Sequence, residues 1–551
     1  MVRTDPEQFP DDVPSEPRFP RGERPLHEYL REGARDHPDR TAIDYYGYEM
    51  SYAELDRAVD SFAAYLAERG YGEGDAILLY LQNCPQFYVG YHAAHRLGMQ
   101  VSPCSPMSKE HRVAYQLDDG DVSVALALDS RADVVEAVRE ETGLADVVYA
   151  RFETYLPDDP VPAVHEEMAA AIDAERRPTD ETTRYFDDVV AETDPDPPDV
   201  ETAMDDVVLL QYTSGTTGMP KGCEHTYWTI LHKAASTATV YGFDGDTRHL
   251  AVMPVFHVAG KLNAVDSPLV DGGTVVLLTR YDPEAMLTAI DAHRPTTAWL
   301  TTPMVREMLD HPARESCDLT SFEEVPATSF GQALTEGLCA RWREATGAEM
   351  FEAAYGLSET HTMDTFTRGL GVVEEGFVGR PNHNVDIVVR DWETHEELPR
   401  GEQGEISVRS PSVMKSYHDK PEKTREDFHD GYVLTGDIGR MTDEGFLYFL
   451  GRRKNMIKSS GYSVAPAEVE QVLKEHDRVE NACVVARDHE RRGEEVVAVV
   501  VPGDGLTEQA VLDYGEEQLA AYKRPRDVLF VDALPVTDVG KVDRERIREL
   551  V

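Results

Sequence analysis

A stretch rich in glycine and hydroxyl side chains, residues 212–222, carries the clearest chemical signal in this chain. It reads Tyr-Thr-Ser-Gly-Thr-Thr-Gly-Met-Pro-Lys-Gly and follows an apolar run at 207–210 that predicts a buried strand. Glycines let backbone N–H groups face a bound anion, while hydroxyls add donors and the lysine adds positive charge. The stretch is therefore expected to cradle a polyphosphate, although it lacks the Walker spacing. A flexible surface loop is the alternative interpretation.

Three later segments also combine chemically useful side chains in a fixed order. Residues 355–360 read Tyr-Gly-Leu-Ser-Glu-Thr, where a carboxylate beside a triphosphate would need a hard cation between them. Residues 432–437 read Tyr-Val-Leu-Thr-Gly-Asp, and the final carboxylate can accept hydrogen bonds from hydroxyl groups. Residues 534–541 read Leu-Pro-Val-Thr-Asp-Val-Gly-Lys. Taken singly, these are a solvated acid, a turn aspartate and an exposed lysine.

In this order the segments closely resemble the motifs of the adenylate-forming superfamily, which includes acyl-CoA synthetases, luciferases and the adenylation domains of peptide synthetases. The resemblance covers about residues 25–551. It implies an α/β fold, with a large N-terminal domain of layered α/β subdomains and a small mobile C-terminal α+β domain. We expect a flexible arm at 1–22, the adenylation domain at 23–450 and the mobile domain at 451–551.

The resemblance implies a role for each matching residue in binding ATP and Mg²⁺. Tyr355 would stack on adenine, Thr360 would contact the α-phosphate and Glu359 would hold Mg²⁺. Asp437 and Arg452 would hold the ribose. The remaining residues expected to bind the nucleotide or coenzyme A are Thr213, Ser214, Gly215, Thr216, Thr217, Gly218, Lys221, Gly331, Gln332, Ala333, Ala354, Gly356, Lys458 and Gly461. At Phe330 the chain departs from the family, which usually has a second glycine there.

Catalysis is expected to depend on Lys541, Thr216, Glu359 and His257, with Lys541 as the residue that drives adenylation. In the family the small domain turns between two half-reactions. The hinge position matches Lys454, within Gly-Arg-Arg-Lys-Asn-Met-Ile-Lys at 451–458. One orientation would present Lys541, and the other would bring the loop around Gly461 to the site.

The segment expected to form the acid pocket, residues 253–260, reads Met-Pro-Val-Phe-His-Val-Ala-Gly. Amino-acid-activating members carry an aspartate where this chain has His257, so the resemblance argues against an α-amino acid. His257 would orient the substrate carboxylate, or it is simply a packed histidine. Residues around Trp228, Thr302, Pro303 and Gly331 are expected in the pocket wall. Lys261 would pair with a second substrate carboxylate if it faced the pocket, and otherwise it would face solvent.

The sequence thus predicts an acyl-CoA synthetase that activates a medium- or long-chain fatty acid as acyl-AMP and transfers it to coenzyme A. An aryl, short-chain or carnitine-like acid is the first alternative. A non-catalytic nucleotide- or acyl-binding protein on the same fold is the second. No carrier domain follows Lys541, which favours free coenzyme A as the acceptor. The oligomeric state stays open, a homodimer included.

The net charge limits the kinds of partner that the protein can bind and indicates the environment in which it works. Lysine and arginine total 54 against 103 acids, so the formal charge is 54 − 103 = −49. Such acidity opposes binding to nucleic acid or to an anionic membrane. Only 12 of the 54 basic residues are lysines. An acidic, lysine-poor surface suggests a protein that stays soluble in strong salt, hence a halophilic host.

The cysteines and the N-terminus favour a reduced cytoplasmic location. The six cysteines are scattered and form no Cys-x-x-Cys pair, which argues against a zinc site or a disulfide framework. Residues 1–25 are acidic and proline-rich, unlike a signal peptide. No apolar run approaches the ~18 residues that span a bilayer.

The sequence pattern predicts alternating strands and helices, and these elements must position the candidate site residues. Helices are predicted after Ser51, before Gly98 and at 466–474, where Pro466 begins the helix. The acidic, proline-containing stretch 180–205 is interpreted as a linker. Strands are predicted at 76–80, 101–103, 122–128, 207–210, 250–253, 274–278, 298–300, 446–450, 482–485 and 496–501.

Overall fold

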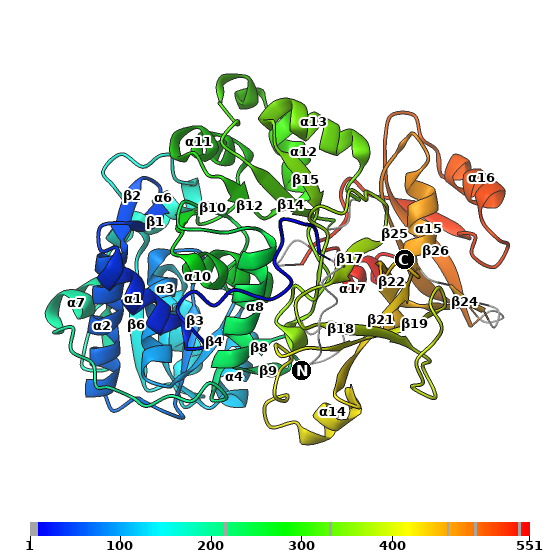
Figure 1. Cartoon of the computed structure of the whole chain (residues 1–551). Coiled ribbons are helices and arrows are strands. Elements are labelled where there is room, and N and C mark those ends of the chain that lie inside the picture. Colours follow the sequence, from blue (N-terminus) through cyan, green and yellow to red (C-terminus); the bar gives the residue numbers. More distant parts are fainter. Residues whose placement is uncertain are drawn as a thin grey trace.

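The computed structural model describes residues 9–213, 219–329, 333–459, 462–464, 466–489, 493–537 and 541–551. Figure 1 shows a large body, blue to yellow, with a smaller orange and red body at its side. Strands of the described residues form four sheets. The mixed α/β architecture, with a large N-terminal and a small C-terminal part, confirms the predicted fold class.

The first sheet carries the predicted phosphate segment at one end. All its neighbouring strands are parallel except the last pair, β8 and β9. The strand order is β7 (Thr183–Tyr185), β6 (Asp146–Ala150), β5 (Val122–Leu128), β3 (Ala76–Tyr80), β4 (Gln100–Pro103), β8 (Val207–Tyr212) and β9 (Gly222–Thr226). The phosphate segment therefore joins two antiparallel strands, beginning at the carboxyl end of β8, where parallel sheets commonly bind ligands.

The second sheet is also mainly parallel, with β2 as its antiparallel edge. Its order is β13 (Leu300–Thr301), β14 (Glu324–Thr328), β12 (Thr297–Ala298), β10 (Arg248–Ala251), β11 (Thr274–Leu277), β1 (Thr41–Tyr45) and β2 (Tyr48–Ser51), with β15 (Glu349–Glu352) pairing to β14. Helices between the two sheets share one continuous apolar core with both of them. The 353–360 segment leaves the end of β15 and so starts from this core.

The third sheet is antiparallel and carries the predicted ribose-binding residues. Its order is β16 (Thr365–Phe366), β17 (Phe377–Pro381), β22 (Leu447–Arg452), β21 (Tyr432–Met441), β19 (Gln403–Arg409) and β18 (Asp386–Arg390), with β20 (Phe428–His429) pairing to β21. Asp437 of β21 faces Arg452 of β22 in this register. Two residues that lie 15 positions apart in sequence are thus brought side by side.

The small C-terminal body has a sheet and an apolar core of its own. The sheet order is β24 (Tyr462–Val464), β23 (Ile457–Ser459), β26 (Gly493–Pro502) and β25 (Val479–His489), with β27 (Asp527–Phe530) pairing to β26. The 3₁₀ turn η7 (Arg453–Asn455) connects β22 to this sheet. This short connection contains Lys454, the predicted hinge residue.

Helices cover the sheets, as Figure 1 shows. Those of the large body are α1 (Leu26–Asp36), α2 (Tyr52–Glu68), α3 (Pro85–Arg96), α4 (Glu110–Asp119), α5 (Ala132–Arg139), α6 (Glu166–Ile172), α7 (Phe186–Glu192), α8 (Tyr227–Val240), α9 (Val258–Lys261), the π-helix η4 (Leu262–Asp266), α10 (Ser267–Asp271), α11 (Pro283–His293), α12 (Thr302–Asp310), α13 (Glu336–Thr346) and α14 (Pro421–Glu426). The small body adds α15 (Pro466–Lys474), α16 (Glu508–Gln518) and α17 (Arg544–Arg548). None of the described helices has the length and apolarity of a membrane span.

Most of the predicted elements are present, with ends shifted by a few residues. Ser51 caps α2 and forms a capping box with Glu54, and α15 spans its predicted residues. The predicted strand at 298–300 is divided between β12 and β13. The stretch 180–205 is not wholly a linker, since it contains β7 and α7, whose Tyr185 and Phe186 are buried. The many acidic residues of this stretch made the short apolar pattern of β7 and α7 hard to recognise in the sequence.

Residues 9–22 differ from the flexible arm that their composition suggested. Phe9 is buried, and its ring stacks on Phe366 and His383 at centroid distances of 4.9 and 4.5 Å. The backbone N–H of Arg18 donates to Thr239 of α8. Aromatic burial thus fixes a polar segment on the large body.

Candidate functional site

The predicted ribose carboxylate lies at the edge of the large body, within the third sheet. Asp437 is almost fully buried, its Oδ2 accepts a hydrogen bond from the Tyr355 hydroxyl at 2.8 Å, and its Oδ1 lies 2.8 Å from Nε of Arg452. Burial raises the pKa of Asp437, while the Arg452 guanidinium acts in the opposite direction. The structure therefore brings together three residues from three separate motifs, and protein groups contact both carboxylate oxygens of Asp437.

Lys541 reaches this region from the small body. Residues 537 and 541 close a narrow loop, because the backbone N–H of Thr537 donates to the Lys541 carbonyl at 2.7 Å and that of Lys541 donates to the Thr537 hydroxyl at 3.2 Å. Surrounding protein atoms and Arg452 lower the pKa of Lys541, which Asp437 and Glu359 act to raise. The side chain remains exposed to solvent. A lysine from the small domain thus lies within electrostatic reach of two predicted ATP-site carboxylates.

Glu359, the predicted Mg²⁺ ligand, is held by a tyrosine that sequence reasoning missed. The Tyr417 hydroxyl donates to Oε1 of Glu359 at 2.8 Å, and the backbone N–H of Met414 donates to the Glu359 carbonyl. Burial and the nearby acids raise the pKa of Tyr417. A partly exposed carboxylate in a site with phosphate-binding features suits a hard cation, so Glu359 fits Mg²⁺.

The two ends of the phosphate segment are closed by backbone hydrogen bonds. The N–H of Thr213 donates to the Lys221 carbonyl at 3.0 Å, and the N–H of Lys221 donates to the Thr213 hydroxyl at 3.1 Å. The Lys221 ammonium lies 3.2 Å from Asp427 and 3.8 Å from the ring centroid of Tyr417. Ser214, Gly215, Thr216, Thr217 and Gly218 lie outside the described residues.

The contact predicted for Thr360 does not agree with its position. Its side chain is fully buried, and its hydroxyl donates to Asp364 and accepts from the backbone N–H of Leu357. Ser358, two residues earlier, is partly exposed, and its carbonyl accepts from His225. The motif has two hydroxyls flanking Glu359, and burial favours Ser358 as the one that faces a ligand.

Ala354 and Gly356 belong to the same segment. Ala354 is partly exposed beside Tyr355, whose ring is buried. A Cβ at Gly356 would lie 2.5 Å from the Thr362 carbonyl carbon, because the chain folds back on itself here. Glycine is therefore required at this position for packing, whatever it contacts in a ligand.

His257 begins α9 and remains partly exposed at one face. Its Nδ1 accepts from the backbone N–H of Ala259 at 3.3 Å. Burial, together with the charge of Lys541, lowers the pKa of His257 to about 3. Its imidazole is therefore neutral near pH 7.

Lys261 meets neither alternative that the sequence offered. It is fully buried and donates to Asp266 at 2.5 Å, to Tyr91 at 3.3 Å and toward His361 at 3.3 Å. Burial lowers the pKa of Lys261, and Asp266 opposes this effect. Lys261 therefore faces neither the solvent nor the acid pocket. It forms a buried ion pair with Asp266, where α9 meets the π-helix η4.

The base-lining and hinge segments are only partly described. Gly331 and Gln332 lie outside the described residues, while Ala333 is partly exposed. Glu352, which the sequence did not single out, accepts from the backbone N–H of Ser329 at 3.1 Å, and burial raises its pKa to about 7. Gly461 is outside the described residues, and Lys458 is placed only by its backbone pairing with Ser463 on β23–β24.

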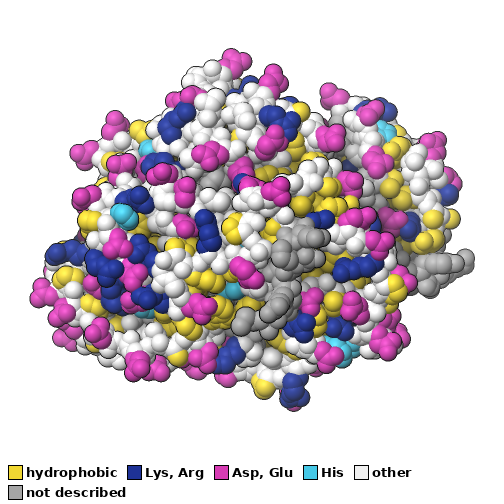
Figure 2. Space-filling model, in the orientation of Figure 1, with side chains coloured by type: hydrophobic (Ala, Val, Ile, Leu, Met, Phe, Trp, Pro, Cys, Tyr) yellow, Lys and Arg dark blue, Asp and Glu magenta, His cyan; other side chains and the backbone are white. Residues whose placement is uncertain are grey.

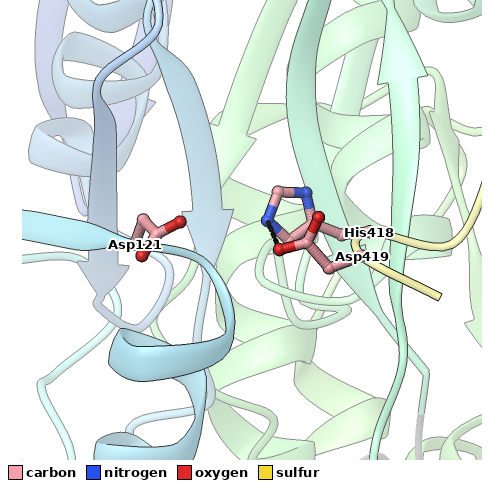
Figure 3. Close-up of side chains that lie close together, drawn as sticks. All are labelled: Asp121, His418 and Asp419. Carbon is pink, nitrogen blue, oxygen red and sulfur yellow. Dashed lines mark ion pairs between the residues drawn. The ribbon is translucent and has the colours of Figure 1, made fainter.

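A group with metal-binding side chains lies apart from Glu359, on the loop after α4 and on the loop between β19 and α14. Figure 3 shows Asp121 facing His418 and Asp419, with their ligand atoms within 4.8 Å of one another. His418 Nδ1 pairs with Glu224 at 3.0 Å, and this contact raises the His418 pKa. Ion pairing of an imidazolium with carboxylates accounts for the group, so the Mg²⁺ prediction stays with Glu359.

The fold is that of the adenylate-forming enzymes, with a small domain placing a lysine at the edge of a large α/β domain. Residues 30–418 match the model of a family described as AMP-binding enzyme, and residues 468–541 match its C-terminal domain. The chain belongs to the AMP-binding enzyme family.

Known relatives extend over nearly the whole chain. The long-chain-fatty-acid–CoA ligase of Bacillus subtilis is 31% identical, covering 98% of this chain and 97% of the relative. The indoleacetate–CoA ligase of Aromatoleum aromaticum is 30% identical, covering 96% of this chain and 98% of the relative. The crystal structure of ATP-bound MatB from Rhodopseudomonas palustris superposes with a TM-score of 0.82 at 26% identity, covering 96% of this chain and 99% of that one.

Proposed function

We propose that this protein is an ATP-dependent acid–thiol ligase that forms acyl-AMP and then acyl-CoA. The observation that carries the proposal is the grouping of Tyr355, Asp437 and Arg452 through contacts of 2.8 Å, with the charge of Lys541 from the small domain acting on Asp437. These residues come from separate motifs in both domains. Their convergence supports a site at which ATP and a carboxylate react.

In the first half-reaction, a carboxylate oxygen attacks the α-phosphorus of ATP, the bond to the bridging oxygen breaks and pyrophosphate leaves. Negative charge spreads over the phosphoryl oxygens in the transition state, so positioned cations lower the barrier. Lys541 would supply one such cation. Mg²⁺, held by Glu359, would neutralise further phosphate charge.

The nucleotide would be held through its ribose and phosphates. Asp437 and Arg452 would bind the ribose, and Tyr355 would pack on adenine. Thr213 to Lys221 would hold the phosphates, with Thr216 among the catalytic residues. Ser358, rather than Thr360, would contact the α-phosphate, because the Thr360 hydroxyl is engaged in the interior.

In the second half-reaction, the thiol of coenzyme A attacks the acyl carbon and AMP leaves. We propose that the small domain turns about Lys454 between the two steps, which removes Lys541 and brings Lys458 and Gly461 to the site. A short connection between two bodies with separate cores favours such a rotation.

For the acid, we propose a medium- or long-chain fatty acid. The similarity to a long-chain-fatty-acid–CoA ligase supports this choice, and a neutral His257 in place of an aspartate argues against an amino acid. An aryl acid is the second candidate, favoured by the similarly close indoleacetate–CoA ligase. Short-chain and carnitine-like acids remain further alternatives, as does a non-catalytic binding protein. The proposed location is the cytoplasm.

The test is ATP-dependent thioester formation at high KCl, with acids from acetate to palmitate and with benzoate and indoleacetate. A peak at medium or long chains supports the fatty-acid assignment. A peak with an aryl acid or acetate keeps the reaction and overturns that assignment. Pyrophosphate release without thioester would exclude coenzyme A as the acceptor, and no turnover of any acid would favour the binding protein.

A further inference from the structure

Two side chains outside the recognised motifs contact the proposed ATP-binding groups. Asp427 follows α14, and its Oδ2 lies 3.2 Å from the ammonium of Lys221. Tyr417 contacts Asp427 through its hydroxyl at 3.1 Å and Lys221 through its ring at 3.8 Å. The lysine proposed to bind phosphate is thus paired with a carboxylate of its own chain.

The same tyrosine also engages the proposed metal ligand. Its hydroxyl lies 2.8 Å from Oε1 of Glu359, and only 2% of Tyr417 is exposed. One buried hydroxyl therefore lies between two carboxylates, those of Glu359 and Asp427. A hydroxyl holds a single proton, so only one of these contacts is donated at a time.

We propose that Asp427 and Tyr417 form an exchange clamp, which holds Lys221 and Glu359 before Mg·ATP binds and releases them when it binds. This inference rests on the proposed function of the site. In the clamp, the Asp427 carboxylate takes the place of a phosphate on Lys221. The Tyr417 hydroxyl takes the place of the cation on Glu359.

The surroundings of Asp427 make this exchange inexpensive in free energy. Lys423 lies 2.8 Å from its other oxygen, so Asp427 keeps a cationic partner after Lys221 leaves. The side chains of Lys221 and Asp427 are 25% and 21% exposed, so water already reaches the pair. A partly solvated ion pair is weak enough to be displaced by the higher charge of a triphosphate.

Asp427→Asn tests the carboxylate part of the clamp. Removing the charge frees Lys221 and removes a repulsion on incoming phosphates, so we expect the Kd for Mg·ATP to fall about 3- to 10-fold. The Kd for AMP, which lacks the β- and γ-phosphates, should change less than 2-fold. Isothermal titration calorimetry of the full-length protein gives both values.

Glu426→Gln is the matched control. It removes one negative charge from the neighbouring residue, which pairs with Lys423 at 3.3 Å and is largely exposed. If Glu426→Gln tightens ATP binding as much as Asp427→Asn, the effect is general electrostatics and the clamp is wrong. Weaker or unchanged ATP binding by Asp427→Asn also overturns it, since the carboxylate would then be positioning Lys221 for ATP.

Tyr417→Phe tests the hydroxyl part while keeping the ring beneath Lys221. Without the hydroxyl on Glu359, half-saturation by Mg²⁺ at fixed ATP should occur at a concentration about 2- to 5-fold lower. A higher requirement for Mg²⁺ would mean that the hydroxyl helps to hold the metal, and it would overturn the clamp. Wild-type protein that binds no ATP would overturn both the clamp and the proposed function, whereas a failure confined to the variants leaves the proposed function intact.

Discussion

At the residue scale, the groups around Lys541 determine how readily its side chain carries a positive charge. Protein atoms and Arg452 favour its neutral form, whereas Asp437 and Glu359 favour the charged form. A bound triphosphate would add negative charge and so would favour the ammonium that adenylation needs. The lysine is therefore best charged when ATP is present.

Lys541→Ala should slow acyl-AMP formation about 100-fold or more, because a preorganised charge on the transition state is lost. Thioester formation from synthetic acyl-AMP and coenzyme A should remain within about 2-fold of the wild type. The two half-reactions are measured as pyrophosphate release and as thioester formation. Arg546→Ala, an exposed change on α17, is the control. Equal loss in both half-reactions would contradict the role given to Lys541.

The variants Ser358→Ala and Thr360→Val should show which hydroxyl contacts the nucleotide and which one stabilises the fold. Ser358 is partly exposed, so its loss should lower the adenylation rate about 10-fold and leave Tm unchanged. Thr360→Val keeps the shape but leaves Oδ2 of buried Asp364 without the hydrogen bond from Thr360, while Oδ1 keeps Lys233, and this costs about 1–3 kcal/mol of stability. Thermal unfolding and pyrophosphate release, measured on both variants, check this. If only Thr360→Val slows adenylation, Thr360 rather than Ser358 contacts the ligand.

Motif residues could be predicted from sequence, but several of their partners could not. The resemblance to the family's motifs identified Asp437, Arg452 and Lys541. Asp437 and Arg452 are in contact, and the charge of Asp437 acts on Lys541. Tyr417 and Asp427 reach Glu359 and Lys221 through contacts across separate segments, which no local pattern shows. Lys261 was misplaced because a lysine in sequence carries no sign of a buried partner such as Asp266.

At the element scale, the connection η7 holds a lysine whose charge is sensitive to the observed domain arrangement. Lys454 has its pKa lowered to about 8, first by burial and then by Arg452, while Glu545 and Asp437 oppose the shift and Arg548 adds to it. Rotation of the small domain would change several of these neighbours. The charge of Lys454 and the orientation are therefore linked.

Raising the pH from 8 toward 10.5 should favour the observed orientation. A group with a lowered pKa binds its proton less well here than in an orientation where its pKa is ordinary, so this orientation gains as the proton leaves. Energy transfer between dyes on the two domains would report the shift. Lys454→Met should weaken the pH dependence, leaving the part that comes from the lowered pKa of Lys541, and an unchanged profile in that variant would contradict the linkage.

Regular elements were predicted more reliably than their ends and the stretches between them. Short apolar runs identified β3, β5 and β8, whose side chains are mostly buried, and Ser51 marked the start of α2. The division of β12 from β13 and the burial of Phe9 depend on neighbours distant in sequence. Local periodicity contains no information about those neighbours.

At the scale of the whole molecule, acidic side chains dominate the electrostatics. Figure 2 shows Asp and Glu spread over the visible face, with Lys and Arg in smaller groups, in line with the formal charge of −49. Such a charge opposes the compact state through self-repulsion, which salt screens. The fold should therefore depend on ionic strength.

Raising KCl from 0.1 M to 2 M should increase Tm by about 10 °C or more, because screening shortens the range of repulsion from ~10 Å to a few Å. Differential scanning fluorimetry at several salt concentrations measures this. Sucrose at matched water activity is the control for effects other than screening. A flat or falling Tm would contradict a salt-adapted surface.

The Asp437–Arg452 contact joins the proposed ribose site to the end of the large domain. Arg452 is the last residue of β22, and the chain passes from it through η7 into the small domain. A ribose that hydrogen-bonds to Asp437 competes with Arg452 for the same carboxylate. Departure of the nucleotide and the proposed rotation of the small domain would therefore both act on this one contact, which would link the order of product release to the Asp437–Arg452 pair.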